Sequence, residues 1–338
     1  MQVEEKIQRL ENYLENKKSI LGFSAGSDST LIAYILSQVS PDSMLVTVDN
    51  NMMPKEFIDY TKKQAKKFKL KHKVINLDFL TDTTFQNNGK ERCYECRKLM
   101  YSNIQEIPEF NEYEYFLEGT NVTDLLENRP GILVLDKFNM TSPLVECSIT
   151  KQDVFEILKY FNLEYSFDTT CLATRIKTNQ KVDSQRLELI YKAEKFVREN
   201  INQENVRVRF DNYTATISVD KPLELLDENL IIRLREKLQK LGFKKVFLDV
   251  TGYEKTELHA STDEEGNYYY QLPYTINLIK TEENIKEREY LDGFITKDTH
   301  LHYNDITIRE NGKISMPPTD KFTTKFNQIL SCIHRKEI

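Results

Sequence analysis

Short apolar runs alternate with segments of helical periodicity through the first half of the chain. The apolar runs predict strands at 20–23, 44–48, 73–77 and 113–117. The periodic segments predict helices at 4–16, 30–36, 55–69 and 151–160. Regular alternation of strand and helix is typical of an α/β fold, here a doubly wound parallel sheet of the Rossmann-like kind.

The pattern changes after this region. A helix at 182–200 precedes alternating strands at 206–210 and 214–219, and a helix at 230–241 precedes a strand at 245–250. Beyond it, 268–272 and 299–303 alternate as strands do, before a helix at 324–332. We therefore expect a first domain at 1–165, a smaller α+β domain at 166–260 and a β-rich C-terminal extension at 261–338 of unknown role.

Composition narrows the class of protein. The 338 residues carry a net charge of −6, which argues against a general nucleic-acid binder. The N-terminus lacks the apolar core of a signal peptide, and no apolar run reaches membrane-spanning length. We expect a cytoplasmic protein without a membrane partner. Its five cysteines are then expected to be thiols, metal ligands or catalytic groups rather than disulfides.

A turn of small residues follows the first predicted strand and opens the next helix. A helix N-terminus presents backbone N–H groups and a positive dipole, and small residues let a phosphate approach the backbone. An ordinary strand-to-helix turn is the alternative, and no Walker-type loop occurs in the chain. The residues assigned to phosphate binding are Ser24, Ala25, Gly26, Ser27, Asp28 and Ser29.

Polar residues also end two other predicted strands. Asp49 closes the second strand, and Gly119, Thr120 and Asn121 form a turn after the fourth. Ligands of open α/β sheets bind at the carboxyl ends of the strands, so we expect ATP, with its adenosine near Asp49, at this edge. Arg129 lies downstream as a candidate anion clamp.

Two of the cysteines form a motif that suggests chemistry. Cys93 and Cys96 form a CxxC near a predicted helix start, flanked by arginine and lysine that favour thiolates. A redox pair, half of a zinc site and part of an iron–sulfur site all remain open from this spacing. Cys147 and Cys332 match no motif and are expected to be ordinary thiols.

The turn at 24–29 resembles the SGGxDS loop of the PP-loop ATP pyrophosphatase superfamily, with Ala25 in place of a glycine. The order of later segments resembles the LarE family, the sulfur transferases of nickel-pincer nucleotide biosynthesis. These segments are Gly119-Thr120-Asn121, Arg129-Pro130-Gly131, Ser142-Pro143-Leu144, Lys151, Cys171 to Arg175 and Arg207-Val208-Arg209. Each is weak alone, but six in the right order make coincidence improbable.

The resemblance implies an enzyme that uses ATP and Mg²⁺ to adenylate a carboxylate of pyridinium-3,5-biscarboxylic acid mononucleotide, or a similar substrate. Sulfur then replaces AMP. In some members the sulfur comes from the cysteine at the position of Cys171. In others a CxxC and that cysteine hold a four-iron four-sulfur (4Fe-4S) cluster that delivers it. We expect the second form, with Cys93, Cys96 and Cys171 as ligands, a sulfide donor as partner, and a homo-oligomer.

The resemblance also implies catalytic roles for Asp28, Cys171 and Glu194. Arg207 and Arg209 point to one face of a strand, where they could hold the substrate phosphate. The family pattern has an arginine and a glutamate in the following strand, where Thr216 and Ser218 stand here. This departure leaves the substrate open.

Two other functions remain as alternatives. A tRNA thiolase of the same superfamily would also use a CxxC and a distant cysteine, although the acidic balance opposes it. A PP-loop ligase of the amidotransferase or zinc-stabilised kind would make the cysteines structural. His300 and His302 share a strand face and could pair on a metal, but surface histidines are the simpler interpretation.

Overall fold

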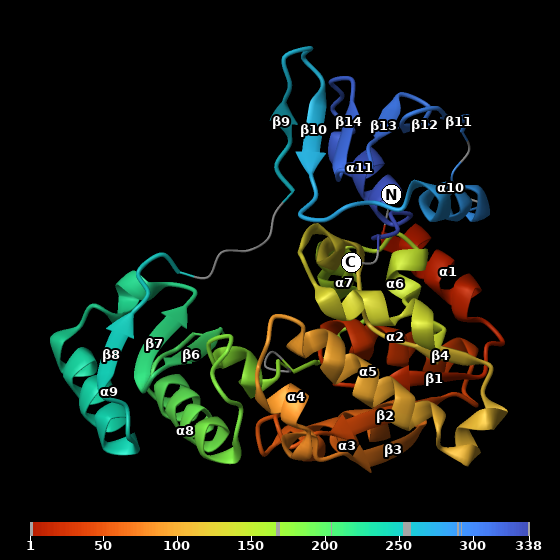
Figure 1. The fold of residues 1–338 in the computed structure, drawn as a ribbon. Coiled ribbons are helices and arrows are strands. Elements are labelled where there is room, and N and C mark those ends of the chain that lie inside the picture. Colours follow the sequence, from red (N-terminus) through yellow and green to blue (C-terminus); the bar gives the residue numbers. More distant parts are fainter. Residues whose placement is uncertain are drawn as a thin grey trace.

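The computed structural model describes residues 3–166, 170–203, 205–252, 258–288, 291 and 293–336. Figure 1 shows three parts: a first domain from red to yellow, a second in green to teal beside it, and a blue C-terminal part on the other side. No helix in the described ranges is long and apolar enough to cross a membrane.

A five-stranded parallel sheet forms the centre of the first domain. Its strands are β1 (Ser19–Gly22), β2 (Met44–Asp49), β3 (Lys71–Asn76), β4 (Tyr115–Leu117) and β5 (Met140–Thr141), in the order β3-β2-β1-β4-β5. The helices of this domain are α1 (Val3–Leu14), α2 (Ser27–Val39), α3 (Phe57–Phe68), α4 (Thr83–Gln86), α5 (Arg92–Gln105), α6 (Pro143–Glu146) and α7 (Lys151–Tyr160). The predicted doubly wound parallel sheet is therefore confirmed.

Alternate residues of β1 show why helices cover both faces of the sheet. Leu21 packs into the apolar cluster that contains the buried faces of α1, α2 and α7. Ile20 points the other way, into a cluster with Tyr101 and Ile104 of α5. Because side chains alternate along a strand, an all-apolar strand needs a layer of helices on each side.

The second domain packs two helices on a three-stranded sheet. Its elements are α8 (Ser184–Asn200), β6 (Val206–Asp211), β7 (Thr214–Val219), α9 (Glu228–Leu241) and β8 (Lys245–Leu248). β6 and β7 are antiparallel and β7 and β8 parallel, which confirms the smaller α+β module. Asn212 and Tyr213 turn the hairpin with φ of 47° and 62°, the left-handed region that a two-residue hairpin turn of this type requires.

The C-terminal part is a six-stranded antiparallel sheet with two helices. Its elements are β9 (Ser261–Thr262), β10 (Tyr268–Gln271), α10 (Leu278–Glu287), β11 (Ile295–Lys297), β12 (Leu301–Tyr303), β13 (Ile306–Ile308), β14 (Lys313–Met316) and α11 (Phe322–Leu330). The β-rich extension is confirmed, although His300 lies before β12 rather than within it. The division of the chain at 165/166 and 260/261 stays a prediction.

The C-terminal sheet shares its apolar core with the first domain. Val122, Leu125 and Leu126 form a short 3₁₀ helix (Val122–Leu126) directly after the turn at 119–121, and they pack among buried residues of β12 to β14 and α11. Tyr274 adds a hydrogen bond of 2.5 Å from its hydroxyl to the carbonyl of Leu125. The segment after the second Gly-bearing turn is thus held by residues far away in the sequence.

This shared core predicts the effect of Leu126→Ala. Removing a buried leucine side chain costs about 2–5 kcal/mol, so amides of β12 to β14 should exchange faster with deuterium. Leu223→Ala is the matched control because Leu223 is 70% exposed. Unchanged exchange in the Leu126 variant would show that the two parts are stabilised independently.

Candidate functional site

The turn between β1 and α2 has the geometry of an anion site. Gly26, the N-cap of α2, has extended backbone (φ −71°, ψ 168°) and no side-chain cap. The first N–H groups of the helix are therefore free of a side-chain acceptor. The hydroxyls of Ser24 and Ser29 face each other at 3.3 Å across the turn, and Ser24 also accepts from the Gly26 amide. The hydroxyl of Ser29 also donates to the carbonyl of Gly26 at 3.2 Å, and phosphate binding at this turn stays a prediction.

Ala25 departs from the superfamily pattern at a strained position. Its φ is +57°, a left-handed conformation that costs a residue with a Cβ about 1 kcal/mol. Its methyl group is fully buried in the first apolar cluster. The carbonyl of Ala25 accepts a 2.8 Å hydrogen bond from the amide of Ser166, which fixes the turn to the segment that leads into the second domain. The additional methyl is thus accommodated without blocking the turn.

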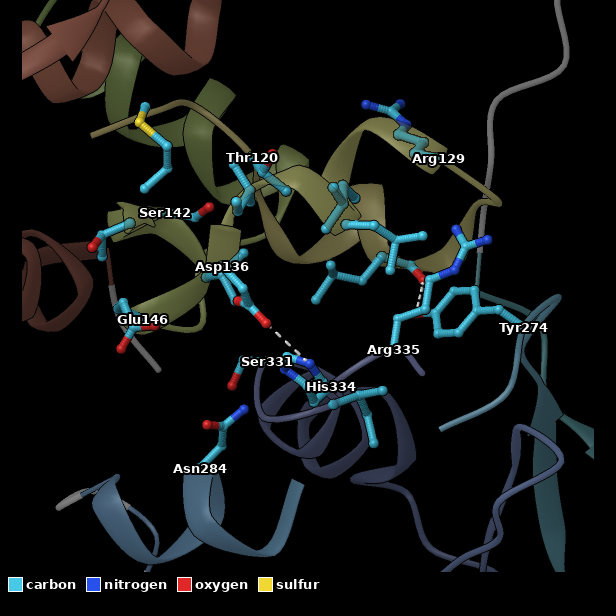
Figure 2. Close-up of a pocket in the computed structure, with 18 of the residues that line it drawn as sticks. Thr120, Arg129, Asp136, Ser142, Glu146, Tyr274, Asn284, Ser331, His334 and Arg335 are labelled. Atoms are coloured by element: carbon cyan, nitrogen blue, oxygen red, sulfur yellow. Dashed lines mark hydrogen bonds and ion pairs between the residues drawn. The ribbon is translucent and has the colours of Figure 1, made fainter. Parts of the chain in front are cut away.

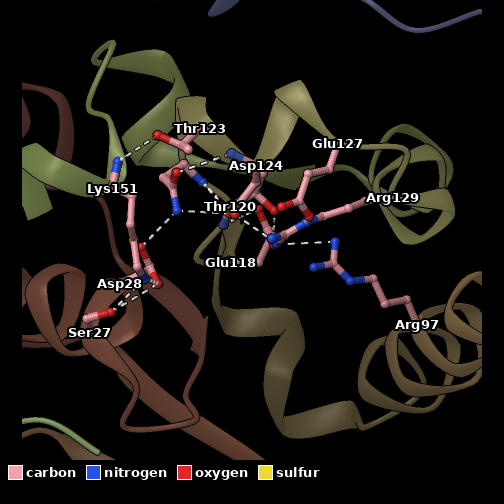
Figure 3. A network of polar contacts seen from close by, with 11 residues as sticks. Ser27, Asp28, Arg97, Glu118, Thr120, Thr123, Asp124, Glu127, Arg129 and Lys151 are labelled. Carbon is pink, nitrogen blue, oxygen red and sulfur yellow. Dashed lines mark hydrogen bonds and ion pairs between the residues drawn. The ribbon is translucent and has the colours of Figure 1, made fainter. Parts of the chain in front are cut away.

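The second Gly-bearing turn lies directly against the first, as predicted. A Cβ at Gly119 would come within 3.3 Å of the Asp28 Cβ and 3.4 Å of the Ser29 amide, so glycine allows this close approach without a shift of the neighbouring turn. Asn121 donates to Asp28 at 3.0 Å. Lys151, the first residue of α7, forms a 2.5 Å ion pair with Asp28 and donates to Ser27 at 2.7 Å (Figure 3).

Lys151 is a residue that the site assignment missed. The sequence marks it as the start of a helix and as one of the ordered family segments, and the N-cap of that helix, Thr150, has a full capping box. That cap orients the first turn of α7, and the amide of Lys151 also donates to Thr123 at 3.0 Å. Its position after the Ser-Pro-Leu segment was the available signal.

Arg129, the predicted anion clamp, is held by two carboxylates. It pairs with Asp124 at 2.7 Å and Glu127 at 2.8 Å. Burial raises the pKa of Asp124 to about 6, against the effect of Arg129. Asp124 also accepts from the Asn121 side chain at 3.0 Å. Arg129 therefore acts on the turn at 119–121 through Asp124, and its role as a ligand of ATP stays a prediction.

A second polar group joins the turn to the helix of the CxxC. Glu118 is buried and accepts from the amide and hydroxyl of Thr120, at 2.8 and 2.7 Å, and from Ser142. Arg97 of α5 lies 3.5 Å from Glu118 and donates to the carbonyl of Gly131 at 3.4 Å (Figure 3). From the sequence, Arg97 was expected only to favour the thiolates of the CxxC, and Glu118 was assigned no role.

The three candidate cysteines come together. Cys93 and Cys96 lie on the first turns of α5, and Cys171 is the N-cap of a 3₁₀ helix, Leu172–Arg175. Burial raises the pKa of Cys96 to about 12, with contributions from Cys171 and Cys93. Burial raises the pKa of Cys171 too, and Cys93 adds to it while the Ala173 amide and Arg92 oppose. Cys96 and Cys171 pack against the same apolar cluster, and Arg92 donates to the Cys93 sulfur at 3.7 Å.

Arg92 and Asn88 fix this neighbourhood. Arg92 donates to the carbonyl of Ala173 at 3.1 Å and to the side chain of Asn88. The buried Asn88 amide donates in turn to the carbonyls of Lys177 and Gln180, both at 2.9 Å. Nevertheless, no group of three His, Cys, Asp or Glu side chains in the described ranges is placed to hold a metal ion. The metal assignment of the cysteines stays a prediction.

The loop after β2 approaches the same cysteines. The amide of Leu172 donates to the carbonyl of Met52 at 2.8 Å. Asp49 ends β2, and its carboxylate accepts from the amide of Asn51 at 3.2 Å. Residues 50–52 therefore connect Asp49, the predicted adenosine region, to the segment that begins at Cys171.

Glu194 lies beside the cysteines rather than beside the phosphate turn. It forms a 2.8 Å ion pair with Arg175, and the two side chains are each 3% exposed. It also accepts from the amide of Val208 at 3.0 Å. Arg175 donates to the carbonyl of Cys171 at 3.4 Å, so Glu194 reaches Cys171 through one side chain.

Arg207 and Arg209 share a face of β6, as the strand period predicts. Arg207 is buried and Arg209 exposed. Their partners across the hairpin are Ser218 and Thr216. The two positions at which the family pattern carries charges thus face the two arginines directly.

The remaining cysteines and histidines take no part in this site. Cys147 and Cys332 are buried in apolar clusters of the first domain and the C-terminal part, as expected for ordinary thiols. His300 and His302 have ring centroids 6.4 Å apart, and His302 pairs with Asp298 at 3.5 Å.

Comparison with known proteins identifies the family. No profile of a known protein family matches the chain. An uncharacterised protein of Methanocaldococcus jannaschii is 31% identical over 246 residues, 72% of this chain and 94% of the relative. The pyridinium-3,5-bisthiocarboxylic acid mononucleotide synthase of Lactiplantibacillus plantarum is 26% identical over 245 residues, 71% of this chain and 88% of the relative.

The chain belongs to the LarE family. An uncharacterised protein of Synechocystis is a further relative, 26% identical over 264 residues, 76% of this chain and 98% of its own length. The resemblance drawn from the ordered motifs is confirmed. In this LarE family member the motif glycines also have a physical role, because Gly119 lets the two turns meet and Gly131 lets α5 approach.

Gly131→Ala tests the contact between α5 and the turn region. A Cβ there would lie 2.9 Å from the Arg97 Cδ and 3.3 Å from the carbonyl of Cys93. Such overpacking typically costs about 1–3 kcal/mol, so amides of α5 should exchange faster. Gly89→Ala is the control, because a Cβ at Gly89 would meet nothing within 4 Å. Equal deuterium exchange of the α5 amides in the two variants would show that the close approach at Gly131 does not stabilise α5.

Proposed function

We propose that this LarE family member is an ATP-dependent sulfurtransferase that acts on pyridinium-3,5-biscarboxylic acid mononucleotide or a similar carboxylated nucleotide. It adenylates a carboxylate and then replaces that oxygen with sulfur, forming AMP and pyrophosphate. The name of the Lactiplantibacillus relative supports the substrate class. The structure supports the proposal through the side-chain contacts that connect α5, the helix of Cys93 and Cys96, to the turn at 119–121.

This connection between α5 and the turn at 119–121 is the observation on which the proposal depends. Arg97 follows Cys96 on α5, and its guanidinium contacts Glu118, which holds the turn residue Thr120. The same turn contacts Asp28 of the first turn through Asn121. Activation and sulfur delivery must act on one carbon, so the two sets of residues must be positioned relative to each other.

The Asp28–Lys151 pair suits binding of Mg²⁺ and ATP. The ammonium of Lys151 pairs with Asp28, and the hydroxyl of Ser27 accepts a hydrogen bond from it. A triphosphate bound to the N-terminus of α2 would attract Lys151, and the freed carboxylate of Asp28 would become available to Mg²⁺. Both changes neutralise charge on the departing pyrophosphate.

The chemistry then has two steps. An oxygen of the substrate carboxylate attacks the α-phosphorus of ATP, and pyrophosphate leaves with the electron pair. A sulfide sulfur attacks the acyl carbon, and AMP leaves as the better leaving group with the electron pair of the broken C–O bond, which gives a thiocarboxylate. Arg209 and Arg207 are the proposed ligands of the substrate phosphate, of which Arg209 is the more accessible. Glu194 positions Arg175 beside Cys171.

Three cysteine thiols are the type of ligand that an iron–sulfur cluster requires. Three thiols gather beside Arg92, which lowers the pKa of both Cys96 and Cys171 against the effect of burial. Cys93 is exposed, so the group can be reached from solvent. A four-iron four-sulfur cluster held by Cys93, Cys96 and Cys171 would supply the sulfide and leave one iron without a protein ligand.

Lys151→Ala tests the nucleotide half of the proposal. Loss of a charged group that stabilises the departing pyrophosphate should lower kcat/KM for ATP by about 10²–10³-fold. Lys159→Ala is the matched control, because Lys159 is an exposed lysine of the same helix. Formation of AMP and pyrophosphate is measured in anaerobic assays. Equal rates in the two variants would exclude Lys151 from the reaction.

Anaerobic turnover tests the sulfur half. Protein purified without oxygen is assayed for iron, zinc and sulfide, then supplied with ATP, sulfide and the mononucleotide. We expect iron and sulfide together, a thiocarboxylate product, and loss of product in each Ala variant of Cys93, Cys96 and Cys171. Cys147→Ala, a buried thiol outside the site, should retain activity.

The same assay separates the alternatives. Loss of one sulfur from Cys171 in the protein mass after a single turnover would establish that the cysteine is consumed. Zinc without iron and an amide product would establish a PP-loop ligase. Salt-sensitive retention of tRNA without turnover of the mononucleotide would establish a tRNA thiolase.

A further inference from the structure

A cavity of about 210 Å³ lies where the C-terminal part meets the first domain. On one side it is lined by Thr120, Arg129 and Asp136, and on the other by Tyr274, His334 and Arg335 (Figure 2). Leu125, Ile132 and Ile333 give it an apolar wall. It therefore combines apolar surface with a few charged groups, as small-molecule sites do.

Every carboxylate that lines the cavity already has a cationic partner. Glu146 is paired with Arg288, Glu127 with Arg129 at 2.8 Å, and Asp136 with Lys280 at 3.2 Å. His334 holds the pKa of Asp136 down at about 2. The cavity therefore has no carboxylate left to attract a cation.

Arg335 is the unbalanced charge in this wall. Its guanidinium lies over the ring of Tyr274, 5.1 Å from the centroid, and no carboxylate in the described ranges lies within ion-pair distance of it. Its Nε is buried without a hydrogen-bond acceptor among the described residues, and so is the Nε of Arg288. Buried donors without an acceptor are rare in native proteins and indicate a missing partner. Burial also lowers the pKa of Arg335, with Glu91 acting on it only from a distance.

We propose that this cavity is a second binding site, for a small organic anion whose carboxylate or phosphate pairs with Arg335 and whose apolar body lies against Leu125, Ile132 and Ile333. The inference stands on the cavity itself and does not depend on the proposed sulfur transfer.

The site is placed to affect the nucleotide turns. Thr120 lines the cavity and is held by Glu118, and Arg129 lines it and is held by Asp124, which contacts Asn121. Asn121 in turn donates to Asp28. An anion in the cavity and a nucleotide at the first turn would therefore act on opposite sides of the same segment.

Fluorine NMR of 4-fluorobenzoate with the full-length chain tests the site. Benzoate has one carboxylate and an apolar ring, so it carries both features that the cavity recognises. We expect saturable binding that ATP with Mg²⁺ does not displace. Arg335→Gln should weaken it by roughly 10- to 100-fold, the value of a hydrogen bond to a charged group. Arg335→Lys should retain more affinity than Arg335→Gln.

Lys336→Gln is the matched control, because it removes the same charge from the adjacent, exposed residue. Crystals of the unaltered protein soaked with 4-bromobenzoate give an independent readout, because bromine locates the probe by anomalous scattering. A bromine peak beside Arg335 supports the proposal even if an Arg335 variant fails to fold. Absence of binding, displacement by ATP, equal binding by Arg335→Gln and Lys336→Gln, or a peak elsewhere would each overturn it.

Discussion

The contact between α5 and the turn at 119–121 is the constraint on which the rest of the site depends. It consists of Arg97 against Glu118 and the carbonyl of Gly131, where a Cβ at position 131 would lie 2.9 Å from the Arg97 Cδ. α5 carries two of the three candidate cysteines, and the turn contacts Asp28. Without this contact the separation between the thiols of α5 and the phosphate turn would depend on hydrogen bonds of other segments, such as those from Ser166 to Ala25 and from Leu172 to Met52.

The order of strands in the sheet explains why segments far apart in the sequence meet at this contact. β1 lies at the centre, with β2 on one side and β4 on the other, so the turns after these strands open at one edge. The loop after β2 reaches Leu172, the turn after β4 reaches Asp28, and the segment after β5 reaches Glu118. The C-terminal part then holds the 3₁₀ helix after the β4 turn from outside.

Much of this could be predicted from the sequence, because local patterns determine it. Apolar runs and the Gly/Ser turn predicted β1, the turn and α2, and the periodic segment at 151–160 predicted α7. β5 is only two residues long and has too little pattern to be recognised. The partners of Arg129, and the roles of Glu118, Arg97 and Lys151, depend on contacts between distant segments that periodicity does not record. The cavity beside Arg335 was unpredictable for the same reason.

A structure of the anaerobically prepared protein with a non-hydrolysable ATP analogue would test the central claim most directly. The account predicts phosphates against the 24–29 turn, and the thiols of Cys93, Cys96 and Cys171 lining the same continuous cavity as the α-phosphate. A nucleotide bound at that turn, with closed protein between its α-phosphate and all three thiols, would contradict it.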